Sequence, residues 1–157
     1  MKTKTERNYP YAVAGRVWIL PTYELTVLRD GSLVVLQREL DRVHRAIGNE
    51  ICGSPENLTV DELDFLCDIT GTTYTELATV LDMNRSSLSR WKKPGVVPSR
   101  ASSNLIKRWF WMKLFGADLS EAEVPLALLD RDAQLLEYLH HRALEDGIAE
   151  PVERRVA

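Results

Sequence analysis

The residues with the most evident chemical capacity lie between Asn84 and Phe115, a stretch rich in lysine and arginine that contains no aspartate or glutamate. Its eight basic residues are Arg85, Arg90, Lys92, Lys93, Arg100, Lys107, Arg108 and Lys113. The segments before and after it are both net negative, and the whole chain has a formal net charge of −3. Cationic side chains concentrated in this way favour binding to a polyanion.

The first part of this stretch predicts a short helix with one polar face. Asn84 can cap a helix that runs through Leu88 and Trp91 and ends at Pro94 and Gly95. Leu88 and Trp91 are three residues apart, so they share a face and are expected to point inward. The outer face then carries side chains that can hydrogen-bond to base edges, above all arginine to guanine. These candidate base-reading residues are Asn84, Arg85, Ser86, Ser89 and Arg90.

A second set of residues around this helix is better suited to phosphate oxygens, which fix position without reading sequence. These candidates are Thr73, Thr75, Ser87, Lys92, Lys93, Arg100 and Ser102. Taken singly, any of them can equally be an ordinary solvated side chain. The set as a whole favours binding, because acids are excluded over 32 consecutive residues.

Three adjacent aromatic residues, Trp109, Phe110 and Trp111, lie in the same basic stretch. Neighbouring residues of a helix point in different directions, so these three cannot all face one core. We expect at least one of them at the surface or in an interface, and the three are our candidate homodimer contact, with the N-terminal hairpin as the open alternative.

Capping patterns predict the helices that position these residues. Thr59 precedes Glu62 by three residues and Thr73 precedes Glu76 by three, and each pair marks a helix start. We expect Leu77, Val80 and Leu81 to line the inner face of the second of these helices. Only a few residues separate it from the helix at Asn84, which predicts a helix-turn-helix. A fourth helix is expected from about residue 100 to 115, with Leu105, Trp109, Met112 and Phe115 as an apolar stripe.

The N-terminal region reads as strands, at residues 13–20, 23–28 and 32–36, with a hairpin turn at Asp30-Gly31. Residues 37–51 and 131–145 read as helices, and the last ten residues as a frayed end. The predicted fold is mainly α with a small N-terminal antiparallel β-sheet and an Xre/Cro-like helix-turn-helix bundle. We divide the chain into residues 1–55 (hairpin and linker helix), 56–116 (helix-turn-helix) and 117–157 (an acidic helical extension).

No motif for catalysis or metal binding is evident, so we expect no enzyme, no cofactor and no metal. Cys52 and Cys67 are fifteen residues apart without neighbouring ligands, and are expected to be buried or incidental thiols. No apolar run approaches the roughly 18 residues that span a bilayer. We therefore expect a cytoplasmic protein that does not contact a membrane.

The motif residues also carry a family resemblance. Leu58-Thr59, Glu62 to Leu66, Thr75 to Ala78 and Asn84 to Trp91 together resemble the helix-turn-helix of the Xre/Cro superfamily, and more narrowly the MqsA (YgiT-type) antitoxin and regulator group. The likeness covers roughly residues 9 to 115. Many members bind zinc through N-terminal cysteines, and this chain has none before Cys52, so it resembles a zinc-free branch.

The resemblance implies a homodimeric repressor of its own or a neighbouring operon, bound to a pseudo-palindromic operator in double-stranded DNA. Three interpretations stay open. The chain is a sequence-specific DNA-binding transcriptional regulator; or it is an antitoxin whose main role is to neutralise a toxin protein, with DNA binding secondary. In a third interpretation, the acidic residues 117–157 mimic nucleic acid or fold back over the basic face.

Overall fold

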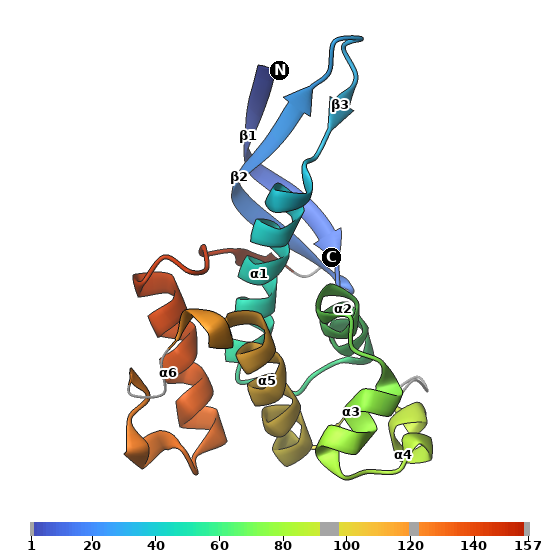
Figure 1. The fold of residues 1–157 in the computed structure, drawn as a ribbon, viewed down its shortest axis with the longest axis vertical. Coiled ribbons are helices and arrows are strands. Elements are labelled where there is room, and N and C mark those ends of the chain that lie inside the picture. The colour runs from blue at the N-terminus through green and yellow to red at the C-terminus, as the bar shows by residue number, and fades with distance from the viewer. Residues whose placement is uncertain (1, 92–97, 120–122, 156–157) are drawn as a thin grey trace.

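The computed structural model describes residues 2–91, 98–119 and 123–155. Its described helices are α1 (Gln37–Gly53), α2 (Val60–Thr70), α3 (Tyr74–Leu81), α4 (Arg85–Arg90), α5 (Arg100–Phe115) and α6 (Asp132–Glu145). Its described strands are β1 (Lys2–Val13), β2 (Arg16–Val27), β3 (Leu33–Val34) and β4 (Glu153–Arg155). Helices dominate and the sheet is small and antiparallel, as predicted. Figure 1 shows the hairpin strands extending from one end of the molecule, with α3 and α4 at the other end.

The two longest strands form a hairpin that closes at Ala14 and Gly15. Both residues have positive φ, 56° and 71°, as a two-residue turn between twisted strands requires. β2 then runs unbroken from Arg16 to Val27, so the prediction of two separate strands at residues 13–20 and 23–28 was wrong. Ala-Gly carries a weaker turn signal than Asp-Gly, because alanine rarely adopts positive φ.

The predicted Asp30-Gly31 turn is confirmed. It joins β2 to β3, which pair antiparallel with Thr26 opposite Val34. Gly31 has a φ of 84°, and the Asp30 carboxylate accepts a hydrogen bond from the Ser32 backbone N–H at 3.0 Å.

The helix starts predicted from capping residues are also confirmed. Thr59 Oγ1 accepts from the Glu62 N–H at 3.1 Å, and Glu62 Oε1 accepts from the Thr59 N–H at 3.0 Å, a complete capping box. Thr73 Oγ1 accepts from the Glu76 N–H at 3.1 Å. Asn84 stands at the start of α4, but its side chain makes no capping hydrogen bond.

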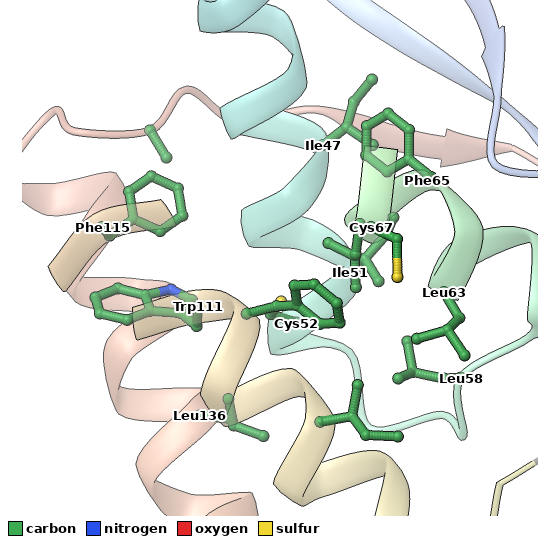
Figure 2. Packing of buried hydrophobic residues seen from close by; sticks show 14 of the residues in the cluster. Ile47, Ile51, Cys52, Leu58, Leu63, Phe65, Cys67, Trp111, Phe115 and Leu136 are labelled. Carbon is green, nitrogen blue, oxygen red and sulfur yellow. The ribbon is translucent and has the colours of Figure 1, made fainter. Parts of the chain in front are cut away.

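One hydrophobic core joins all three segments into which the sequence was divided. Figure 2 shows Ile51 of α1, Leu63 of α2, Trp111 of α5 and Leu136 of α6 within it, and Trp18 of β2 belongs to the same cluster. Cys52 and Cys67 are buried, as expected.

The prediction of a frayed C-terminus was wrong for residues 148–155. β4 pairs with β2 at the other end of the chain, with Arg154 opposite Trp18. The Arg154 guanidinium donates to Glu62 Oε2 at 2.8 Å and to Glu56 Oε2 at 2.7 Å. A strand of three residues leaves almost no local pattern, so only its distant partner reveals it.

Among the described residues, no helix has both the length and the apolar character needed to cross a bilayer.

Candidate nucleic-acid interface

Three residues, Asp82, Met83 and Asn84, connect α3 to α4. Asp82 adopts the left-handed conformation (φ 52°, ψ 46°) and ends α3, and the Met83 N–H donates to the Ala78 carbonyl at 2.9 Å. Asn84 is extended (φ −70°, ψ 140°), which redirects the chain into α4. The result is a pair of short helices joined by a tight turn, the local arrangement that the sequence predicts.

Apolar side chains fix α4 against the rest of the molecule. Leu77 of α3 and Leu88 of α4 have no exposed surface, and Trp91, directly after α4, is 8% exposed. The predicted inward placement of Leu88 and Trp91 is therefore confirmed. With this face buried, the other face meets solvent: Asn84, Arg85, Ser86, Ser89 and Arg90 are all exposed, and Ser87 is half-buried.

The two predicted base-reading arginines are exposed and have no polar partner among the described residues. Within the described part of the chain, neither the Arg85 nor the Arg90 guanidinium makes a hydrogen bond or an ion pair. The Ser89 hydroxyl donates to the Arg85 carbonyl at 3.0 Å, which holds Ser89 against the helix backbone. A free guanidinium offers two parallel N–H donors, which match the O6 and N7 acceptors of guanine.

The predicted phosphate-binding residues fall into different environments. Thr73 and Thr75 are exposed at the start of α3, and the Thr73 hydroxyl oxygen already caps that helix. Ser102 is half-buried and bonded to Ser99, the residue that caps α5. Arg100 is exposed, but its Nη1 donates to the Pro55 carbonyl at 2.9 Å. Lys92 and Lys93 lie outside the described residues.

Lys107 lies inside the protein, although the sequence analysis counted it among the basic residues of a positive surface. Its side chain is almost fully buried, with 1% of the residue exposed. Its Nζ donates to the Ser54 carbonyl at 2.6 Å and to the Glu56 carbonyl, both in the loop between α1 and α2. Burial lowers the pKa of the Lys107 ammonium group. This charge therefore stabilises a loop and does not face a ligand.

Two further cations of α5 are paired within the chain. Arg108 Nη1 donates to Asp132 Oδ1 of α6 at 3.0 Å. Lys113 Nζ lies 3.2 Å from Glu76 Oε1 of α3 and 4.8 Å from the centre of the Trp109 ring. Among the described basic residues between 84 and 115, only Arg85 and Arg90 are left without a polar partner.

The predicted dimer contact needs correction at two of its three residues. Phe110 and Trp111 have no exposed surface, and Trp111 Nε1 donates to the buried Asn49 side chain at 2.9 Å. Neither residue can meet a second subunit, because the chain's own core covers both. Trp109 is half-buried and remains a candidate.

Of the stripe predicted for α5, only Phe115 is buried. Leu105 is 45% exposed and Met112 is 43% exposed, and the half-buried Trp109 lies on the same side of the helix. The buried face carries Ser103, Ile106, Lys107, Phe110, Trp111 and Phe115 instead. The spacing of Ser103, Ile106 and Phe110 was the available signal, but a serine did not suggest a core position.

Sequence reasoning also passed over Lys4 and Glu6 of β1. Their side chains form an ion pair, with Lys4 Nζ 3.0 Å from Glu6 Oε1. Opposite charges two residues apart in an otherwise polar segment were the signal for a strand with a charged face.

No family model, curated protein or solved structure matches this chain. Its function is therefore inferred from its own residues and their arrangement.

Proposed function

We propose that this chain is a sequence-specific DNA-binding transcriptional regulator of the cytoplasm. In this proposal α4 enters the major groove, and Arg85 and Arg90 donate hydrogen bonds to base edges. One observation carries it: of the described basic residues in the acid-free stretch, the two on the outer face of α4 have no internal partner. A guanidinium without an internal partner, on a helix whose inner face is buried, has no internal hydrogen bond to break before it binds.

Neighbouring hydroxyls support the same orientation. Ser86 and Ser89 share the exposed face of α4, and Thr73 and Thr75 are exposed at the start of α3. In a helix-turn-helix the first helix crosses the DNA backbone while the second lies in the groove. Thr73 and Thr75 are then placed to bind phosphate oxygens, which sets the position of α4 on the duplex.

We further propose that the protein acts as a repressor on a pseudo-palindromic operator, with two copies reading successive half-sites. Half-sites for paired recognition helices are spaced about 34 Å apart, one turn of DNA. The proposed contact between these two copies is the apolar side of α5 that carries the exposed Leu105 and Met112 and the half-buried Trp109, because an apolar surface of this kind favours a protein partner.

Selection from a pool of randomised duplexes tests the proposal. The purified protein is expected to enrich one symmetric sequence, and a footprint on that sequence is expected to show two protected half-sites. A double variant, Arg85→Ala with Arg90→Ala, is expected to enrich nothing. Recovery of unrelated sequences by the unaltered protein would contradict sequence-specific binding.

A further inference from the structure

Among the described strands, β1 has a neighbour on one side only. Both β3 and β4 pair with β2, so within the described sheet the outer edge of β1 is unpaired over all twelve of its residues. Figure 1 shows the N-terminal end of β1 at the end of the molecule opposite to α4, beyond the helices. A strand edge of this length exposes backbone N–H and C=O groups that can pair with another strand.

The hairpin turn determines which residues direct these groups outward. Val13 and Arg16 are opposite one another across the two-residue turn, and such a closing pair exchanges its backbone hydrogen bonds. Odd-numbered residues of β1 therefore bond to β2, and even-numbered residues face the free edge. Pro10 agrees with this assignment, because proline lacks an N–H and is tolerated only where none is needed for pairing.

The regular part of the free edge is short. Asn8 has a φ of 49°, outside the range of extended backbone, and Pro10 offers no donor. The segment that can pair regularly is thus Lys2 to Arg7. Within it Lys4 and Glu6 are even-numbered, and their side chains point to the same exposed face.

A lysine on a strand edge ordinarily discourages pairing. Here Glu6 alters that effect, because two copies meeting antiparallel must place even-numbered residues opposite one another. Setting Lys4 opposite itself, or Glu6 opposite itself, brings like charges together. In the register intermediate between these two, Thr5 lies on the two-fold axis and Lys4 of each copy lies opposite Glu6 of the other. Both of these Lys4–Glu6 pairs across the two strands attract.

We propose that β1 pairs with β1 of a second copy of this chain, antiparallel and in the register centred on Thr5. The two sheets then form one continuous sheet, and the Lys4–Glu6 ion pairs of the two copies form an alternating square of charges. This interface goes beyond the DNA-binding proposal and does not depend on it. The two-fold axis relates the copies antiparallel, so the two α4 helices lie at opposite ends of the assembly. They would then bind two separate stretches of DNA.

Disulfide trapping tests the register. In the proposed pairing the two Thr5 residues are a non-hydrogen-bonded pair with Cα atoms about 4.5 Å apart, within the range of a disulfide. Thr5→Cys in the full-length protein is expected to form a covalent dimer under mild oxidation. Thr3→Cys is the matched control, because Thr3 is also exposed and lies on the same face, but opposite the partner's Arg7. We expect about tenfold less cross-linked dimer from it.

Charge substitution in the Thr5→Cys background tests the specificity. Lys4→Glu alone and Glu6→Lys alone each place like charges opposite one another, so each is expected to cross-link poorly with itself. A mixture of the two variants pairs an all-acidic edge with an all-basic edge, and is expected to restore the covalent dimer. Equal cross-linking of Thr5→Cys and Thr3→Cys, or a mixture no better than its components, would overturn the proposal. Circular dichroism checks that each variant is folded.

Discussion

Lys107 donates to the carbonyl oxygens of Ser54 and Glu56, which belong to the loop that leads from α1 to α2. Lys107→Met keeps most of the side-chain volume but leaves these oxygens without their donor. We expect the free energy of unfolding to fall by about 1–3 kcal/mol, measured with urea. Lys113→Met removes a surface ion pair and is expected to cost less than about 1 kcal/mol. An equal loss in both variants would contradict the structural role of Lys107.

Cys52 provides a pH-dependent prediction. It has no exposed surface, and burial raises the pKa of its thiol to about 12 from an ordinary value of 9.0. The folded thiol therefore keeps its proton where the unfolded one loses it, so this contribution to stability is complete below pH 9 and is lost as the pH rises towards 12. Cys52→Ala is expected to lessen the alkaline fall by about 1 kcal/mol per pH unit.

Urea unfolding of the unaltered and the Cys52→Ala protein between pH 8 and about pH 11 measures this difference, since that range brackets the unfolded thiol pKa. Cys67→Ala removes another buried thiol and is the control for lost volume. Parallel pH profiles for the unaltered and the Cys52→Ala protein would rule out Cys52 as the titrating group.

At the level of elements, the C-terminal strand is held by one buried ion pair. Arg154 donates to Glu62, whose side chain is only 3% exposed and also completes the capping box of α2. Arg154→Ala leaves that carboxylate buried without its cation, and is expected to cost about 3–5 kcal/mol of stability. Arg155→Ala, on the same strand but exposed, is expected to cost less than about 1 kcal/mol. Thermal unfolding separates the two variants.

The elements that were predictable are those whose signals are local. Thr59 and Thr73 indicate helix starts because their hydroxyl groups can cap a helix, and Asp30-Gly31 indicates a turn because of its backbone preference. β4 was not predictable, because its pairing partner lies at the other end of the chain. Which face of α5 is buried was not predictable either. Aromatic residues at three successive positions are compatible with any buried face, and Lys107 was assumed to be exposed.

For the candidate interface, the sequence correctly indicated which side chains of α4 face inward and which face outward. Leu88 and Trp91 are buried, and Arg85 and Arg90 are exposed. It did not indicate how many of the later cations are paired. That count depends on tertiary contacts, such as the one between Arg108 and Asp132 of α6.

For the whole molecule, these internal pairs change the expected dependence of DNA binding on salt. Each phosphate neutralised by a cation adds about −0.9 to the slope of log affinity against log salt concentration. Arg108 and Lys113 are paired within the chain, so Arg108→Met and Lys113→Met are expected to leave the slope unchanged. Lys92→Ala is expected to reduce it by about 1 and to weaken binding to all DNA alike. A shallower slope for Arg108→Met would show that Arg108 does contact phosphate.

The contact of α6 with α5 also bears on the acidic C-terminal segment. Through Asp132 it pairs with one cation of the basic stretch, Arg108, whereas none of its described residues pairs with Arg85 or Arg90. The described part of this segment therefore packs against the side of α5 and not over the exposed face of α4.

The central claim is that Arg85 and Arg90 read sequence, and the ratio of affinities for the selected operator and for scrambled DNA tests it most directly. Arg85→Ala and Arg90→Ala are each expected to lower this ratio about 5- to 150-fold, which corresponds to about 1–3 kcal/mol. Arg29→Ala removes another exposed arginine, from the β2–β3 turn, that has no polar partner among the described residues, and is expected to leave the ratio unchanged. An unchanged ratio for Arg85→Ala and Arg90→Ala would contradict the account.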